Sequence, residues 1–260
     1  MKIAVLSPIA WRTPPRHYGP WEQMASNLAE GLNAAGIDVS LFATGDSITS
    51  ATLDSVAAKG YEDDRDQDAK VIECLHISNL MEKAGQFDLI HNHFDFLPLT
   101  FSRLIKTPML TTIHGFSSEK IIPVYKKYNS TSSYVSISNS DRSPELQYLS
   151  TVYNGIRAED FTFNADPDDY LLFFGRIHPD KGTKEAIDIA KKSGKRLIIA
   201  GIIQDEQYFK QEIEPSIGED ISFYGHAGPE ERNKLLGKAL TLLHPILFDE
   251  PFGLSVAEAM

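Results

Sequence analysis

Near its amino terminus the chain carries a short apolar segment, Lys2-Ile3-Ala4-Val5-Leu6-Ser7, from which the fold can be worked out. Such a compact aliphatic run is typical of a buried strand. A loop over residues 8–20 with four prolines follows it, and residues 37–43 alternate as a second strand. The residues between the loop and the second strand predict a helix.

This helix is indicated by apolar residues that recur at helical spacing, and Gly36 then supplies a stop. The recurring residues are Trp21, Met24, Ala25, Leu28, Leu32 and Ala35. A strand, a helix and a strand in this order form a βαβ unit. Such a unit predicts a parallel sheet with a right-handed crossover.

The same alternation continues and predicts a doubly wound α/β domain over residues 1–160. Further strands are expected at residues 87–91, 108–113, 134–138 and 151–153, with a helix at residues 71–84. Residues 44–70 are polar and acidic, and we expect them to form a solvated loop.

A second α/β domain is predicted over residues 161–260, and the polar residues 161–169 are the best candidate for a linker. The expected strands of this domain are residues 170–174, 196–200, 221–224 and 242–247. Its expected helices are residues 184–193, 207–213, 230–240 and 254–260.

The composition excludes several classes of partner. The chain has 260 residues and a formal net charge of −11, so its field repels nucleic acid and anionic lipid over a broad surface. Cys74 is the single cysteine, which leaves no intrachain disulfide and no thiolate metal cluster. No signal peptide or apolar run of about 20 residues is recognised, and a reducing cytoplasm is the expected compartment.

The loop after the strand at residues 170–174 carries the clearest chemistry. It contains Gly175, Arg176 and Lys181 and leads into a helix. Ligands of open α/β sheets bind at this end of a strand. An arginine can hold a diphosphate through two hydrogen bonds and a lysine acts as a point charge, so the loop predicts a phosphate site. A solvated surface loop is the alternative.

Two further turns could contact a ligand. Gly19 and Pro20 precede the first predicted helix, where a ligand could approach the backbone, although a simple tight turn is an equal alternative. Glu250 and Glu258 stand eight residues apart around Gly253, at the start of the last predicted helix. Carboxylates in this position can accept hydrogen bonds from sugar and ribose hydroxyls, but two glutamates alone are weak evidence.

Histidines end two of the predicted strands. His114 follows the strand at residues 108–113, and His91 and His93 follow the one before it. A zinc hydrolase that uses His91, His93 and Asp95 is one hypothesis, because histidines in this pattern can form half of a zinc site. Histidines held by ordinary hydrogen bonds are the favoured interpretation. The sequence has no P-loop, no dinucleotide fingerprint and no nucleophile elbow.

Together these motifs resemble a retaining glycosyltransferase of family 4 with the GT-B fold. The resemblance spans the whole chain in the family's order, through residues 18–22, 112–115, 152–156, Phe161, 173–182, 197–201 and 250–260. It implies an α/β protein of two Rossmann-like, doubly wound domains that face a cleft. The first would be the acceptor side, over residues 1–160, and the second would bind the nucleotide sugar, over residues 161–260.

The resemblance also implies roles for single residues. Arg176 and Lys181 would bind the donor diphosphate and stabilise the leaving group, a form of electrostatic catalysis that needs no metal and no cofactor. Glu250 would contact the transferred sugar, and Glu258 would hold the ribose hydroxyls. The other expected contacts are His114 at the reacting centre, and Gly19, Gly175, Phe252, Gly253 and Leu254 at the donor.

The substrates expected from the resemblance are a nucleotide sugar, UDP-glucose or a relative, and a small acceptor, with retention of configuration by a route that could be a same-face substitution. Two features depart from the family. Pro20 stands where a second glycine is usual, and the second domain lacks the family's last strands and helices, so we expect a truncated chain with an open sheet edge that could self-associate. A binding module without turnover, or a half-enzyme completed by another chain, are the alternatives.

Overall fold

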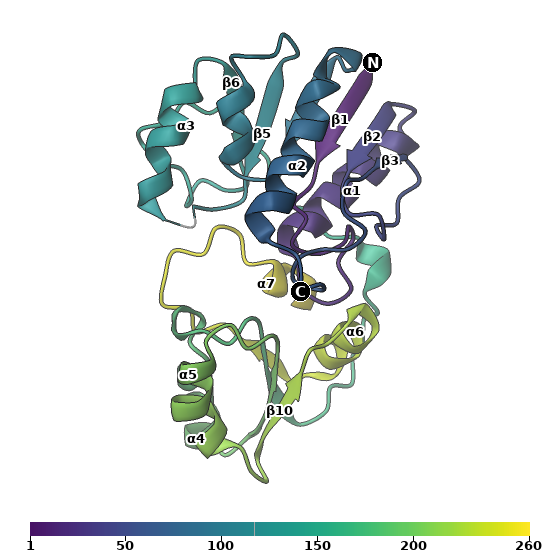
Figure 1. Ribbon diagram of the computed structural model, residues 1–260. Coiled ribbons are helices and arrows are strands. Elements are labelled where there is room, and N and C mark those ends of the chain that lie inside the picture. Colours follow the sequence, from purple (N-terminus) through teal and green to yellow (C-terminus); the bar gives the residue numbers. More distant parts are fainter. Residues whose placement is uncertain (117) are drawn as a thin grey trace. The chain divides into compact units, whose positions relative to one another are not determined.

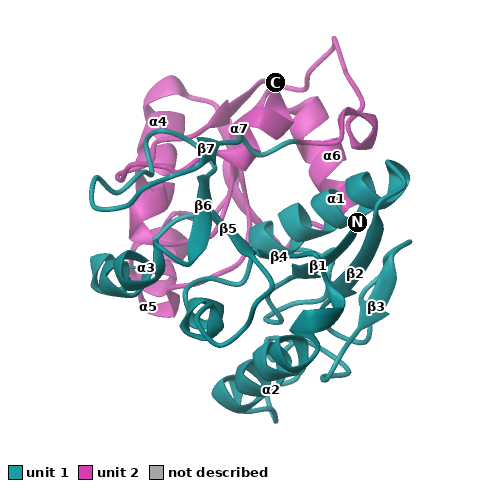
Figure 2. Cartoon of the chain, turned by 90° about the horizontal axis from the view of Figure 1, so that it is seen from above, with its two compact units in different colours: residues 1–155 teal, residues 156–260 magenta. Residues whose placement is uncertain are grey.

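The computed structural model describes residues 1–116 and 118–260 (Figure 1). The chain divides into two compact units, residues 1–155 and 156–260, which Figure 2 shows in different colours. Each unit is an α/β structure built on its own parallel sheet. The expected fold class, two Rossmann-like domains of successive α/β units, is therefore confirmed.

Unit 1 contains a seven-stranded sheet in the order β3-β2-β1-β4-β5-β6-β7, and all its paired strands run parallel. The strands are β1 (Lys2–Leu6), β2 (Asp38–Phe42), β3 (Thr52–Asp54), β4 (Leu89–Asn92), β5 (Met109–Ile113), β6 (Ser132–Ser136) and β7 (Ser150–Thr151). The βαβ unit predicted at the amino terminus is confirmed, because β1 pairs with β2 in parallel on either side of α1 (Pro20–Ala34).

Helices cover both faces of this sheet. Ala25 and Ala29 of α1 pack with Ile3 and Val5 of β1 in one hydrophobic cluster. The second cluster joins Ala4 and Leu6 of the same strand to α2 (Ala69–Glu82) and α3 (Ile122–Tyr128). Alternate residues of a strand point to opposite faces, so β1 contributes to both cores. The unit is doubly wound.

The structure corrects two details of unit 1. Residues 44–70, which we expected to be a loop throughout, contain the strand β3, which pairs with β2 through Ser40 and Thr52. The strand is only three residues long and lies at the sheet edge, so it carries little periodic signal. The helix α3 was not expected either. It is seven residues long and has a proline in its first turn.

Unit 2 contains a four-stranded parallel sheet in the order β10-β9-β8-β11. Its strands are β8 (Tyr170–Phe174), β9 (Arg196–Ala200), β10 (Ile221–Gly225) and β11 (Thr241–Leu243). Its helices are α4 (Thr183–Ser193), α5 (Glu206–Tyr208), a π-helical segment (Phe209–Ile213), α6 (Pro229–Lys238) and α7 (Leu254–Ala259). The four expected strands are confirmed, although β11 ends before residue 247.

This second sheet is also covered on both faces. Leu171 and Phe173 of β8 pack with α4 in one cluster, while Tyr170 and Leu172 pack with α6 in the other. The central strand β8 is therefore buried from both sides, and its carboxyl end leads directly into the loop with Arg176. Among the described residues, none of the helices is both long and apolar enough to cross a membrane.

Candidate functional site

The loop between β8 and α4 is held in place by two glycines. A Cβ atom at Gly201, which follows β9, would come within 1.7 Å of the carbonyl oxygen of Gly175. A Cβ atom at Gly182 would come within 1.9 Å of the carbonyl oxygen of Pro245. Both glycines also have positive φ angles, of 149° and 71°. Only glycine allows the three segments at the carboxyl ends of β8, β9 and β11 to approach this closely.

Arg176 is oriented by two partners. Its Nη2 donates to Oδ2 of Asp180 at 2.7 Å, and its Nη1 donates to the side-chain oxygen of Gln204 at 2.5 Å. The Arg176 side chain keeps 20 % of its surface exposed, so it is not closed off from a ligand. Neither partner was predicted from the sequence: Asp180 lies within the motif at residues 173–182 but was given no role, and Gln204 lies outside every recognised motif.

Lys181 forms an ion pair with Glu250, although 69 residues separate them in the sequence. Its Nζ lies 4.7 Å from the centre of the Phe248 ring, and both charged side chains are more than 80 % buried. Nε2 of His244 lies 4.0 Å from the same carboxylate. Burial lowers the pKa of His244 in spite of the carboxylate.

The backbone connects the same two segments. The N–H of Leu247 donates to the carbonyl of Asp180 at 2.8 Å, beside the close contact between Gly182 and Pro245. Unit 2 thus brings together three of the predicted site residues: Arg176, Lys181 and Glu250. A guanidinium and an ammonium stand at the carboxyl end of a parallel sheet, each beside a carboxylate. This arrangement can exchange a carboxylate for a phosphate group.

The last helix, α7, begins after Gly253, whose φ angle of 82° lies in the left-handed region. The carbonyl of Gly253 accepts hydrogen bonds from the N–H groups of Val256 and Ala257 at 3.0 and 3.2 Å. The predicted residues Phe252 and Leu254 flank this turn. Glu258 lies on the helix and binds Nη1 of Arg232 at 2.9 Å, with only 10 % of its side chain exposed. Burial raises the pKa of Glu258, and Arg232 opposes that rise.

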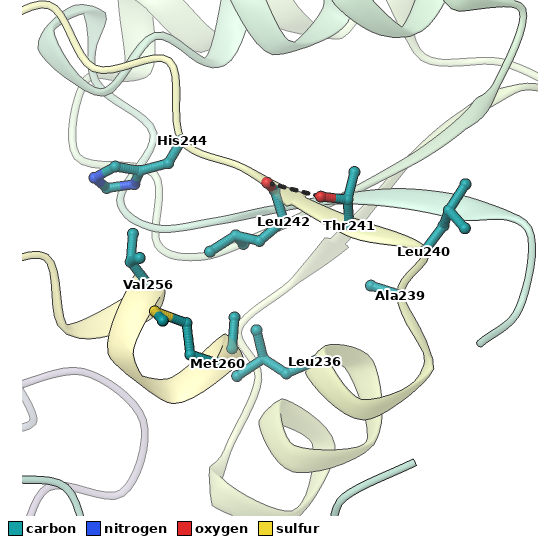
Figure 3. A pocket seen from close by; sticks show the side chains of 9 residues that line it. Leu236, Ala239, Leu240, Thr241, Leu242, His244, Val256 and Met260 are labelled. Atoms are coloured by element: carbon teal, nitrogen blue, oxygen red, sulfur yellow. Dashed lines mark hydrogen bonds between the residues drawn. The ribbon is translucent and has the colours of Figure 1, made fainter. Parts of the chain in front are cut away.

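A pocket of about 370 Å³ lies between α6, β11 and α7 (Figure 3). Its lining is mostly apolar and consists of Leu236, Ala239, Leu240, Thr241, Leu242, His244, Val256, Ala259 and Met260. Of these, His244 also contacts the predicted donor site, through Glu250.

In unit 1, the space beside Gly19 is taken up by Glu22. A Cβ atom at Gly19 would lie 2.8 Å from Oε2 of Glu22 and 2.9 Å from Cβ of Pro15. Glu22 is only 3 % exposed, and its Oε1 accepts a hydrogen bond from the N–H of Trp11 at 3.3 Å. Burial raises the pKa of this carboxyl to about 7. Gly19 is therefore needed for the packing of a carboxyl at the start of α1.

The histidines of unit 1 form a buried chain at the carboxyl ends of β4 and β5. Nδ1 of His93 and Nε2 of His114 share a hydrogen bond of 2.9 Å, and the ring of Trp21 stacks on His114 at 5.6 Å. His91 Nε2 bonds to Oγ1 of Thr112 at 2.8 Å. Burial lowers the pKa of His114 to about 3 and that of His91 to about 4, so both are neutral at pH 7.

The residues of the zinc hypothesis have partners within the protein. His93 is bonded to His114, and a carboxylate oxygen of Asp95 accepts a hydrogen bond from the Tyr125 hydroxyl. Within residues 1–116 and 118–260, no group of three or more His, Cys, Asp and Glu is arranged to hold a metal ion. Hydrogen-bonded histidines, the favoured interpretation, match this geometry.

The sequence matches two family profiles that together account for most of the chain. The profile of Glycosyltransferase Family 4 matches residues 22–157, more than half of the chain, and that of Glycosyl transferases group 1 matches residues 157–260. The chain belongs to glycosyltransferase family 4. It is a glycosyltransferase, an enzyme that moves a sugar from a nucleotide-sugar donor to an acceptor.

Individual relatives of this family-4 glycosyltransferase are distant. An uncharacterized glycosyltransferase of Methanocaldococcus jannaschii is 22% identical over 314 aligned positions, which cover 100% of this chain and 78% of that protein. Among solved structures, sucrose-phosphate synthase from Thermosynechococcus elongatus is 18% identical and superposes with a TM-score of 0.77, covering 100% of this chain and 78% of that one.

A second structure, AviGT4, is described as a glycosyltransferase involved in avilamycin A biosynthesis. It is 22% identical, with a TM-score of 0.68, and the match covers 100% of this chain and 76% of that one. At these identities the similarity establishes the fold alone. The fold of this family-4 glycosyltransferase is therefore GT-B, as the sequence analysis expected.

Proposed function

We propose that this glycosyltransferase transfers glucose or a related hexose from a UDP-sugar to a small acceptor, with retention of the anomeric configuration and without a metal or cofactor. The observation that carries the proposal is the convergence of Arg176 and Lys181 at the carboxyl end of β8, where ligands of open α/β sheets bind. Two fixed cations in a largely buried site suit a diphosphate, which carries negative charge in the ground state and gains more as the sugar departs.

The proposed donor site extends from these cations. Arg176, with Gly175 beside it, and Lys181 bind the diphosphate, while Glu250 exchanges its partner Lys181 for a hydroxyl of the transferred sugar. The turn of Phe252, Gly253 and Leu254 then lines the donor. Glu258 accepts hydrogen bonds from the ribose hydroxyls, because a buried carboxylate is a strong acceptor for neutral O–H donors.

The proposal for unit 1 concerns the acceptor and the reacting sugar. His114 is neutral, so it can donate or accept one hydrogen bond at the reacting centre without adding a charge. Gly19 is proposed to take part in donor binding through its backbone. Its neighbour Glu22 is a buried carboxyl whose pKa is raised to about 7, so the protonated form of Glu22 would add no negative charge beside this glycine.

The test is calorimetric titration of the chain with UDP, beside the variants Arg176→Ala and Lys181→Ala. We expect each variant to weaken binding at least tenfold, since each loses a charge-assisted contact worth about 1.5–3 kcal/mol. The control is Lys234→Ala, which also removes a positive charge but lies on α6 outside the proposed site. Undiminished UDP binding in both site variants would reject the proposal.

Turnover is tested separately with a panel of UDP-sugars. Released UDP is measured with and without candidate acceptors, and NMR of the product gives its anomeric configuration. We expect EDTA to leave the rate unchanged, because the two cations replace a metal. A product with inverted configuration, or a rate lost on chelation, would contradict the corresponding part of the proposal.

A further inference from the structure

Arg232 and Glu258 form an ion pair between α6 and α7. The distance from Nη1 of Arg232 to Oε1 of Glu258 is 2.9 Å, and 20 % and 10 % of the two side chains are exposed. Most ion pairs at a protein surface are screened by water and contribute little, but this one is largely withdrawn from it. A carboxylate buried to this extent requires a partner for its charge.

Arg232 is itself held on an aromatic ring. The centre of its guanidinium lies 5.3 Å from the centre of the Phe161 ring. Phe161 packs against the core of unit 2 that contains Leu235 and Leu236. The next residue, Thr162, is attached to α6 because its N–H donates to the side chain of Asn233 at 2.9 Å. The segment with the Phe161 ring is therefore attached to α6, the helix that carries Arg232.

The electrostatics of Glu258 depend on this arginine. Burial disfavours the ionised carboxylate and Arg232 favours it, so the two effects oppose each other on the pKa of Glu258. Two other titratable side chains, Glu250 and His244, lie near the start of α7: the Cβ position of Gly253 is 3.8 Å from Cγ of Glu250 and 3.9 Å from Nε2 of His244. Among the described residues, Arg232 is the charged group that acts on Glu258.

We propose that Arg232 is a positioning residue for the ribose of the donor: it orients Glu258 and keeps its carboxylate ionised, ready to accept hydrogen bonds from the two ribose hydroxyls. The inference rests on the ribose role of Glu258 in the proposed function. It adds a residue that no motif of the sequence identified, and it assigns Phe161 the task of holding that residue in place.

The test uses two ligands, UDP and 2′-deoxy-UDP, titrated calorimetrically into the chain and into Arg232→Met at pH 6.0 and 8.5. For the native chain we expect UDP to bind more tightly than its deoxy analogue at both pH values. In Arg232→Met, UDP affinity should fall at least tenfold at pH 6.0 and by less at pH 8.5, because a higher pH favours the ionised form of the unpaired carboxylate. The affinity for 2′-deoxy-UDP should fall much less.

The controls separate charge from structure. Arg232→Lys keeps the charge and should restore most of the affinity and the weak pH dependence. Lys238→Met removes a positive charge from the same helix, where Lys238 forms an exposed pair with Asp168 at 3.6 Å, and should change neither the affinity nor its pH dependence. Circular dichroism verifies that each variant is folded. If Arg232→Met does not fold, Arg232→Gln takes its place in the experiment.

The outcomes are distinguishable. If Glu258→Gln weakens UDP binding but Arg232→Met weakens both ligands equally at both pH values, Arg232 is merely structural and the inference is wrong. If the native chain does not bind UDP, or Glu258→Gln leaves binding unchanged, the proposed role of Glu258 is wrong, and the inference is rejected with it.

Discussion

Lys181 and Glu250 are paired across 69 residues of sequence, and the pair occupies the position in which the donor diphosphate and its sugar are proposed to bind. Each side chain thus has a partner within the protein that a substrate would have to replace. In the proposed complex, a phosphate would replace the carboxylate as the partner of Lys181, and a sugar hydroxyl would replace the ammonium as the partner of Glu250. The pair keeps both groups in place before the donor arrives.

Removing the carboxylate of this pair should therefore separate nucleotide binding from sugar transfer. We expect Glu250→Gln to bind UDP roughly fivefold more tightly, since a competing contact worth about 1 kcal/mol is lost. Sugar transfer should fall at least a hundredfold, because the contact to the transferred sugar is lost too. Calorimetry and a UDP-release assay measure the two effects. Weaker UDP binding by the variant would contradict the exchange of partners.

Gly182 should tolerate no side chain. A Cβ atom there would lie 1.9 Å from the carbonyl oxygen of Pro245, so Gly182→Ala must force the loop between β8 and α4 away from residues 244–250. Gly194 is a matched control, because its φ angle of 63° is also left-handed but nothing lies within 4 Å of its Cβ position. We expect the free energy of unfolding to fall by about 1 kcal/mol in Gly194→Ala and by more than about 3 kcal/mol in Gly182→Ala.

Hydrogen exchange measured by mass spectrometry tests this difference. Faster exchange in peptides from β8 and α4 is expected for Gly182→Ala, with loss of UDP binding. Gly194→Ala should keep the hydrogen-exchange rates and the UDP binding of the native chain. Equal behaviour of the two variants would show that the contact with Pro245 does not constrain the loop.

Glu22 should make unit 1 less stable as the pH rises. Its pKa is raised from 4.5 to about 7 in the folded chain, so protonated Glu22 is favoured by folding. The contribution is fully present below pH 4.5 and is lost as the pH rises to 7, by roughly 3 kcal/mol. Glu22→Gln should remove this dependence and be the more stable chain at pH 7.5.

Urea denaturation followed by tryptophan fluorescence measures this effect, because Trp11 and Trp21 both lie in unit 1. Glu82→Gln, an exposed position on α2, is the control and should follow the native chain. If the native chain and Glu22→Gln differ by the same free energy at pH 5 and pH 7.5, the titration of Glu22 is not the cause.

His76 should make the chain less stable as the pH falls, which is the opposite direction to the effect of Glu22. Its Nε2 donates to the carbonyl of Ser7 at 2.9 Å, and burial lowers its pKa from 6.5 to about 4. The neutral ring is therefore favoured by folding, and that contribution is lost as the pH falls from 6.5 to 4. Between pH 7 and pH 5 the native chain should lose about 2 kcal/mol more than His76→Gln, which keeps a donor for Ser7.

The same urea experiment at pH 7 and pH 5 checks this prediction. His17→Gln is the control, because His17 is exposed. A native chain whose stability changes with pH in the same way as that of His76→Gln would show that the buried ring does not resist protonation.

How far the sequence determined the fold is clearest in the strands. The aliphatic run of β1 and the similar run of β8 are buried on both faces, and such continuous apolar segments are recognisable without a structure. The three-residue strand β3 was missed, because it depends on pairing with β2 at the sheet edge rather than on its own composition. Short edge elements are formed by their neighbours.

The candidate site divides in the same way. Arg176, Lys181, Glu250 and Glu258 stand in motifs, so their residue types and spacing were readable in the chain. Lys181 and Glu250 are each other's partners, but two further partners stand in no motif. Gln204 reaches Arg176 from the loop after β9, and Arg232 reaches Glu258 from a different helix.

From the sequence alone, the main strands and helices follow from local periodicity, while the family and the residues with chemistry to offer follow from motifs of residue type and spacing. The tertiary structure is needed to see which charges neutralise one another, which carboxyls are buried and which glycines allow two backbone segments to approach closely. Those properties depend on distances between residues that are far apart in the chain, such as Lys181 and Glu250. Burial then sets their electrostatics, since the energy of a charge depends on how much water surrounds it.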